Sequence, residues 1–391
     1  MKAAEYVFWG CLVLVGYVYC LYPVLLFLVY SLVQALRDLR YLATRRDRRT
    51  PLQSSADLPP VSLIIPAYNE ERALPGKIIN LTQLDYPYDK LEVILVSDGS
   101  TDGTNEILQS LPDPRVRAVL LPVRRGKFQA LNHGAEHARH DILVFSDAST
   151  LFAPDAVKNL ARHFSDLRLG VVCGAVRLVG NAESRQTEGL YWKYESGLRL
   201  MEARLGATLY ASGCIYAVRQ QCYRPLAPQD LTDDLVIPLR ARKLGYQVRY
   251  DPEASATEFS ADSVKAEFTR RVRLAVGGFR ALKEIVCLPL WNFTGIAFLS
   301  HKLLRWVLPF FLIGLLVGNA FLLESPGYRI ALLVQACFYL WATLGFLFRS
   351  RMQRSRYALF GYFLVTIQLA FLVGFWRFLF GRPRSAWQRV S

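Results

Sequence analysis

Long apolar stretches lie near both ends of the chain, and the middle has a different pattern. Residues 6–36 carry no charged side chain, and about 20 apolar residues suffice to cross a bilayer as a helix. Three more apolar stretches lie towards the other end, at 306–323, 328–348 and 357–380. The pattern predicts one membrane-spanning helix within 1–36 and about three within 301–380. A cleaved signal peptide fits poorly, because the first stretch is too long and no small-x-small site follows it.

Basic residues flank these stretches and predict the topology. Residues 37–59 form a basic linker that contains six arginines. The positive-inside rule places that linker, and the middle domain after it, in the cytoplasm. We therefore expect a multi-pass protein of the inner (plasma) membrane. Four spans would put the basic tail 381–391 outside, so either the last span departs from the rule or one C-terminal segment is re-entrant or interfacial.

Short apolar runs alternate with helical patterns in the middle of the chain. The runs are residues 61–65, 91–96, 116–121, 141–146 and 170–176, and segments such as 126–139 between them have helical periodicity. Alternating strands and helices predict an α/β domain with a mostly parallel sheet, which we place at 60–260. The basic amphipathic segment 261–300 is expected to lie at the membrane interface.

Polar and acidic residues follow three of the predicted strands, in PAYNEE (66–71), SDGSTDGT (97–104) and SDAST (146–150). In parallel sheets, ligands bind outside the carboxyl ends of the strands. A single acid in such a place is more often a helix cap, but three strand ends together favour a site. Asp98, followed by Gly99, can accept hydrogen bonds from a nucleobase imide or from ribose hydroxyls.

A glycine and a lysine, Gly126 and Lys127, begin one of the predicted helices after two arginines. A helix N-terminus and a cation together favour a phosphate group. A basic, solvated loop is the competing interpretation. At the start of a later helix, Asp233 and Asp234 are either catalytic carboxylates or acids that the helix dipole stabilises.

The net charge of +15 changes this picture little. Much of it lies in arginines beside the predicted spans, where anionic headgroups and topology explain it. The sequence has no zinc-finger spacing and no recognition helix, so nucleic acid is not an expected partner. The seven cysteines include no C-x-x-C pair, and we interpret them as free thiols in a reducing compartment.

Five motifs in this order resemble the inverting family 2 glycosyltransferases, which have a GT-A fold. They are PAYNEE (66–71), SDGSTDGT (97–104), GKFQALNHGAEHA (126–138), SDAST (146–150) and LTDDLVIPLRARKLGYQVRY (231–250). The resemblance covers about residues 60–280. The apolar ends suit the branch that contains the cellulose, chitin and hyaluronan synthases.

The resemblance implies a role for each matching residue. Asp98 would hold the nucleotide base, and Asp147 would face the diphosphate and a Mg²⁺ or Mn²⁺ ion that neutralises the leaving group. Asp234 would be the general base that takes a proton from the acceptor hydroxyl. Three further residues would contact the donor: Glu70, Lys127 and Arg273.

The chain departs from the family pattern at three positions. Ser149 replaces the second acid of Asp-x-Asp, which predicts a weaker metal site. Arg270 and Leu274 stand where the family has Gln and Trp, and in polymerising members that Trp offers a flat face to the acceptor sugar.

Three hypotheses for the function follow. The first is a membrane-bound transferase that moves one sugar from a UDP-sugar to a polysaccharide or lipid-linked acceptor. The second is a processive synthase that also translocates its polymer; Leu274 and the small number of spans favour the first slightly. The third, from another class, is a non-catalytic scaffold subunit that binds nucleotide or glycan.

Overall fold

The computed structural model describes residues 2–44, 58–179, 182–227, 232–259, 264–285, 291–348 and 356–381. Much of the predicted basic linker and nearly all of the predicted basic tail therefore lie outside the described residues. The same holds for the arginines at 349, 351 and 354, on which the topology prediction partly depends. The predicted topology stays a prediction.

An eight-stranded sheet forms the centre of the middle domain, in the order β3-β2-β1-β4-β7-β6-β8-β5. The first four strands in that order are parallel neighbours, and β6 is parallel to β8. β7 runs antiparallel to β4 and β6, and β5 antiparallel to β8. The bounds are β1 Val61–Ala67, β2 Leu91–Asp98, β3 Val116–Leu121, β4 Ile142–Ser146, β5 Leu151–Phe152, β6 Leu169–Val179, β7 Ile215–Arg219 and β8 Gln247–Phe259.

Helices cover both faces of the sheet, which is why its central strands are continuous apolar runs. Successive side chains of a strand point to opposite faces. Ile64 of β1 packs in one core cluster with Leu131, whereas Leu63 packs in another with Leu74. The first face is covered by α5 (Lys127–His137) and α8 (Asp233–Lys243), and the second by α3 (Leu74–Thr82), α4 (Thr104–Gln109) and α6 (Ala156–Ala161).

All five apolar runs of the middle domain form strands, and the mostly parallel α/β architecture is confirmed. Three strands were not predicted. β5 has only two residues, and β8 mixes polar and apolar residues without a clear run. β7 places an antiparallel strand inside the sheet, and its five residues are too short to show a direction in the sequence.

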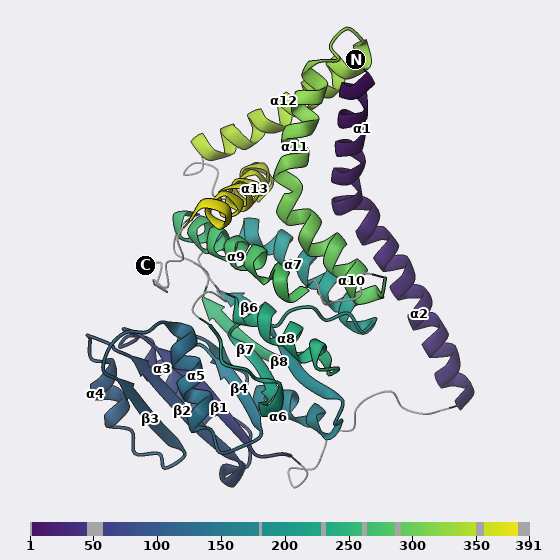
Figure 1. The fold of residues 1–391 in the computed structure, drawn as a ribbon. Coiled ribbons are helices and arrows are strands. Elements are labelled where there is room, and N and C mark those ends of the chain that lie inside the picture. The colour runs from purple at the N-terminus through teal and green to yellow at the C-terminus, as the bar shows by residue number, and fades with distance from the viewer. Residues whose placement is uncertain are drawn as a thin grey trace.

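Among the described residues, four helical segments are long and apolar enough to cross a membrane. The first, Lys2–Thr44, is continuous through α1 (Lys2–Gly16), a π-helical turn (Tyr17–Leu21) and α2 (Tyr22–Thr44). The second contains α10 (Phe293–Ala297) and α11 (Leu304–Ala320), and the third is α12 (Pro326–Leu347). The fourth, Leu359–Phe380, is the larger part of α13 (Arg356–Phe380). Figure 1 shows α1, α11 and α12 extending away from the sheet on one side of the molecule.

Glycines allow the long helices to approach closely, as in other membrane helix pairs. A Cβ added at Gly318 of α11 would lie 3.2 Å from the backbone of α1. A Cβ at Gly374 of α13 would lie 2.5 Å from Ala275 of α9 (Val264–Ile285). The predicted amphipathic segment therefore packs against α13. Figure 1 shows α9 and α7 (Ala182–Arg204) between the sheet and the long helices.

A group of buried charged side chains connects α7 to the start of α11, and we call it the junction cluster. Glu195 accepts hydrogen bonds from Lys302 at 2.7 Å and from Arg305 at 2.6 Å. The two ring nitrogens of His301 face Glu202 at 2.8 Å and Glu195 at 3.1 Å. The cluster joins the middle domain to the second apolar segment through ion pairs.

Candidate active site

The loops after β1, β2 and β4 meet at one edge of the sheet, because these strands are parallel neighbours. Asp98 ends β2, and Asp147 directly follows β4. Asn69, just beyond β1, has a φ of 52°, which few residues other than glycine adopt. Its side-chain oxygen accepts a hydrogen bond from the Thr101 amide at 2.8 Å. The predicted strand-end motifs therefore do come together.

Asp98 is buried and connects β2 to the start of α5. Its two carboxylate oxygens accept hydrogen bonds from the backbone amides of Arg125 and Gly126, each at 2.7 Å. Gly126 has a φ of 96°, a conformation for which glycine is suited. Asp98 thereby fixes the backbone just before Lys127. Its oxygens have further lone pairs that can accept hydrogen bonds from a ligand. The contact of Asp98 with a nucleobase stays a prediction.

The loop after β2 packs tightly against the segment that leads into α5. Gly99 has a φ of 65°, and a Cβ there would lie 2.4 Å from the backbone nitrogen of Arg124. The guanidinium of Arg124 in turn lies 4.0 Å from the centroid of the Tyr68 ring. Only glycine fits this close approach, so the Asp98-Gly99 pair in the sequence has a structural reason.

Lys127 and Asp147 form an ion pair with an Nζ–Oδ1 distance of 2.6 Å. Burial alone would lower the pKa of Lys127, but the charges of Asp147 and Asp233 outweigh it and raise that pKa above its ordinary value. A permanently charged ammonium at the start of α5 suits a phosphate group. The structure thus brings together two residues that the sequence analysis assigned to the donor.

Two adjacent acids, Asp233 and Asp234, begin α8. The hydroxyl of Tyr216 on β7 donates to Asp233 at 3.1 Å. Burial and the charge of Asp233 raise the pKa of Asp234 to about 7. A carboxylate with such a pKa can exchange a proton near neutral pH, as a general base must. Asp234 has this property, and Asp233 is a hydrogen-bonded first-turn acid.

Helix α9 brings two arginines to the same edge. Burial and the charge of Arg270 lower the pKa of Arg273. Nearby acids oppose that shift, and they are Asp147, Asp233 and Asp234. Arg273 therefore lies within electrostatic reach of all three carboxylates. We call the group formed by Lys127, Asp147, Asp233, Asp234 and Arg273 the donor edge.

Two acids of the strand-end motifs have structural contacts. Glu70 is 4% exposed, and its backbone amide donates to the hydroxyl of Thr104 at 2.9 Å. Asp102 accepts hydrogen bonds from the amides of Thr104 and Glu71, although the N-cap residue of α4 is Gly103. The donor-binding role of Glu70 stays a prediction.

Sequence reasoning missed two charged residues beside Asp147. Lys77 of α3 is 0% exposed and reaches under the SDAST loop. Glu258, near the end of β8, lies 3.8 Å from the thiol of Cys214, and burial and the charge of Asp147 raise its pKa. A signal for Lys77 exists, because it lies one helical turn from Leu74 and from Leu81 on the face of α3 where apolar residues are expected.

The donor edge can hold a divalent cation only if oxygens of a bound ligand complete the coordination of the ion. Asp147 offers one carboxylate, and Ser149 a hydroxyl two residues later. Within the described ranges, no group of three or more His, Cys, Asp or Glu could hold a metal ion. Hard cations also take phosphate oxygens. The residues present therefore fit an ion that a bound diphosphate shares.

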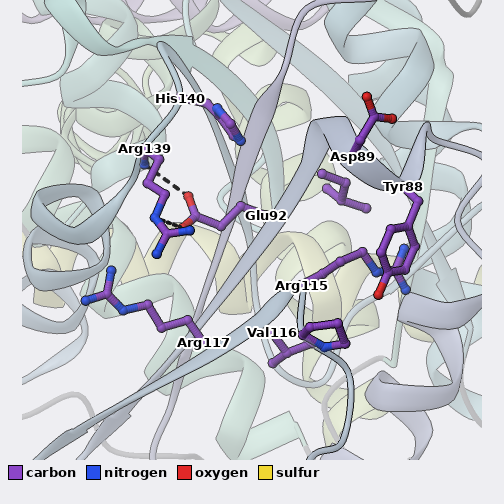
Figure 2. A pocket seen from close by; sticks show the side chains of 10 residues that line it. Tyr88, Asp89, Glu92, Arg115, Val116, Arg117, Arg139 and His140 are labelled. Carbon is purple, nitrogen blue, oxygen red and sulfur yellow. Dashed lines mark hydrogen bonds and ion pairs between the residues drawn. The ribbon is translucent and has the colours of Figure 1, made fainter.

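A hollow of about 530 Å³ lies at the opposite edge of the sheet, at the amino ends of β2 and β3. Figure 2 shows the side chains that line it. They include Arg115, Arg117 and the pair formed by Arg139 and Glu92. The Arg139 guanidinium lies 3.6 Å from the Glu92 carboxylate. None of the residues assigned to the donor lines this hollow, so it is separate from the donor edge.

Comparison with known sequences shows what the middle domain is similar to. The sequence profile of the glycosyl transferase family 2 matches residues 62–224. A probable glycosyltransferase of Bacillus subtilis, YdaM, is 28% identical over 253 residues, which are 61% of this chain and 59% of that protein. The poly-beta-1,6-N-acetyl-D-glucosamine synthase of Staphylococcus aureus is 26% identical over 254 residues, 63% of this chain and 60% of the synthase. The chain thus matches about three-fifths of the length of these curated relatives.

Comparison with solved structures shows the fold. The mannosyltransferase PcManGT of Pyrobaculum calidifontis, solved in complex with GDP-Man and Mn²⁺, superposes with a TM-score of 0.66. The match covers 92% of this chain and 98% of the mannosyltransferase at 22% identity. At that identity the likeness establishes the shared GT-A architecture.

Proposed function

We propose that this chain transfers a sugar from a nucleoside-diphosphate donor to a membrane-associated acceptor, and the match of residues 62–224 to the glycosyl transferase family 2 supports this. The observation that carries the proposal is the donor edge. It combines an acid of raised pKa, Asp234, with two cations suited to a diphosphate, Lys127 and Arg273. A general base beside an anion site is what a direct displacement at an anomeric carbon requires.

In the proposed reaction, Asp234 accepts the proton of the acceptor hydroxyl as its oxygen attacks the anomeric carbon. The new C–O bond forms while the bond from that carbon to the diphosphate oxygen breaks. The diphosphate departs from the opposite face, so one displacement inverts the anomeric configuration. Lys127 and Arg273 stabilise the negative charge that develops on the leaving group.

A divalent ion, Mg²⁺ or Mn²⁺, belongs to this proposal. Asp147 would hold it together with oxygens of the donor diphosphate, and the ion would neutralise charge on the leaving group. The Lys127–Asp147 ion pair would then open or lengthen, because cation and ammonium share one carboxylate. Mn²⁺ in the mannosyltransferase structure supports an ion at such a site.

The donor and acceptor classes are part of the proposal. We propose a UDP-sugar donor, and a polysaccharide or lipid-linked acceptor in cell-surface glycan synthesis. The synthase named above supports an acceptor of this class. Four apolar helical segments support a multi-pass protein of the plasma membrane, with the transferase domain on the cytoplasmic face.

Addition of a single sugar is favoured over polymer synthesis. Leu274 follows Arg273 on α9 and is 37% exposed, so the position of the family Trp offers no flat aromatic face to an acceptor sugar. The synthase relative supports the processive alternative. A ladder of long products from purified protein and labelled donor would contradict single addition.

A screen of sugar nucleotides tests the proposed activity. Purified protein in detergent or nanodiscs is incubated with UDP-sugars, and with GDP-mannose for comparison, in Mg²⁺ or Mn²⁺. Release of UDP that requires both the ion and an acceptor is expected. If no sugar nucleotide is hydrolysed or transferred, the scaffold hypothesis replaces this one.

A further inference from the structure

Lys77 supports the SDAST loop from inside the protein. Its ammonium donates to the hydroxyl of Ser146 at 2.7 Å and to the carbonyl oxygen of Thr150 at 2.6 Å. These two residues are the first and last of the loop that presents Asp147. The nitrogen also lies 4.6 Å from the centroid of the Phe152 ring. One buried side chain thus connects both ends of the loop.

A fully buried lysine is rare unless it is paired or functional. The two hydrogen-bond acceptors of Lys77 are neutral oxygens. Burial lowers its pKa to about 7, and the charge of Asp147 opposes that shift. Asp147 is thus a carboxylate within electrostatic reach of the buried lysine, and it also pairs with Lys127.

The charge around this loop differs from that of an Asp-x-Asp loop. Two acids would give a charge of about −2 and would recruit a free cation. Here Asp147 contributes one negative charge and Ser149 none, while Lys127 contributes a positive charge from the side. Lys77 contributes a second one from below when it is protonated, which is the larger fraction below pH 7. The loop therefore has one anionic ligand where Asp-x-Asp has two, and a buried lysine lies beneath it.

We propose that Lys77 is a built-in cation of the donor-diphosphate site, which lets the SDAST loop bind a nucleoside diphosphate without a divalent ion. This inference rests on the proposed function, because it assigns the loop to a donor diphosphate. Lys77 acts through the loop and through its charge, and is a positioning residue.

The test is calorimetric titration of the full-length protein with UDP at pH 6.5, once in EDTA and once in Mn²⁺. Lys77→Met removes the charge and keeps the length of the side chain. Asn80→Ala is the matched control, because Asn80 lies one turn later on α3, is buried, and bonds both backbone groups of Phe152 at 2.8 Å. Ser149→Asp also makes the charge around the loop more negative, as Lys77→Met does, but at the outer side of the loop.

We expect Lys77→Met to weaken UDP binding in EDTA about tenfold, as loss of one nearby charge predicts. Binding in Mn²⁺ should weaken less, so the affinity gained from Mn²⁺ grows. Ser149→Asp should shift the Mn²⁺ dependence in the same direction, and Asn80→Ala should leave both affinities within about twofold of wild type. Should Lys77→Met fail to fold, the wild type decides: UDP binding in EDTA would support the inference, and UDP binding only in Mn²⁺ would overturn it.

Three further results would overturn the inference. If folded Lys77→Met binds UDP in EDTA as tightly as wild type, the proposed role of Lys77 is overturned, while the proposed donor site is not. An equal loss in Asn80→Ala would show that loop geometry, and not charge, is responsible. A wild type that binds neither UDP nor GDP, with or without Mn²⁺, would overturn both the donor site and the role of Lys77.

Discussion

The donor edge and the junction cluster are both groups of partly or fully buried charges, and they differ in how the charges are compensated. In the junction cluster, Glu195 faces His301, Lys302 and Arg305, and Glu202 faces His301, all at 2.6–3.1 Å. Burial would raise the pKa of Glu195, but His301, Lys302 and Arg305 hold it well below its usual range. At the donor edge, burial and a neighbouring acid instead raise the pKa of Asp234 to about 7.

This difference separates a structural role from a chemical one. A fully paired group resists any change in its protonation and keeps two parts of the molecule together. A group that lies beside a like charge can gain or lose a proton at little cost, which suits catalysis. Substitutions in the two groups should therefore affect different properties, activity in one and stability in the other.

The largest expected effect is that of Asp147→Ala. Asp147 is the only carboxylate of the SDAST loop, and its removal leaves Lys127 without its 2.6 Å ion-pair partner. We expect sugar transfer to be abolished, measured as UDP release with acceptor present. Asp166→Ala, which removes an exposed ion pair with Arg168, is the control. Full activity of Asp147→Ala would contradict the metal and diphosphate role of the loop.

Glu195→Gln should destabilise the protein without changing the chemistry of the folded fraction. It removes the carboxylate that His301, Lys302 and Arg305 face at 2.6–3.1 Å, and the loss of one partner of a buried ion pair costs about 3–5 kcal/mol. Thermal unfolding in detergent measures this. Glu136→Gln, on an exposed pair with His133, should have almost no effect. Equal unfolding temperatures for the two variants would remove the contrast between the clusters.

Activity should depend on pH through Asp234. The general base must be ionised, and burial with the charge of Asp233 raises its pKa to about 7. The value of kcat/KM should therefore be constant above about pH 7.5 and fall about tenfold per unit below about pH 6.5. A pH series with saturating metal measures it. A flat profile from pH 5.5 to 7.5 would argue against Asp234 as the base.

Ser149→Asp should have the smallest effect. It restores the second acid of Asp-x-Asp, so we expect the protein to tolerate it. The Mn²⁺ concentration for half-maximal activity should fall roughly tenfold, because an added carboxylate tightens binding of a hard cation. Titration of activity with Mn²⁺ checks this, and an unchanged midpoint would place Ser149 away from the ion.

Much of the fold could be predicted from the sequence because its strands are buried on both faces. Continuous apolar runs such as 61–65 and 91–96 predicted the strands, and the glycine and acidic residues that follow them predicted where the strands end. The antiparallel β7 could not be predicted, because its five residues are too short to show a clear pattern. The length of the first helical segment, 43 residues, also exceeded the apolar stretch, because helix continues into polar residues after 36.

The residues of the candidate site that lie in sequence motifs could be predicted. The residues and properties that depend on tertiary contacts could not. Lys127 and Asp147 are 20 positions apart in the sequence and meet at 2.6 Å, as the shared sheet edge implied. The contacts of Lys77 with the SDAST loop depend on how α3 packs under β4, which no local pattern shows. The raised pKa of Asp234 depends likewise on burial in the folded domain.

The central claim is that Asp234 takes the acceptor proton at a nucleotide-sugar site, and one comparison tests it most directly. Wild type and Asp234→Asn are assayed together for UDP binding and for sugar transfer at pH 7.5. We predict that Asp234→Asn binds UDP like wild type and transfers sugar about 10²–10⁴ times more slowly. Transfer at the wild-type rate by Asp234→Asn would contradict the claim.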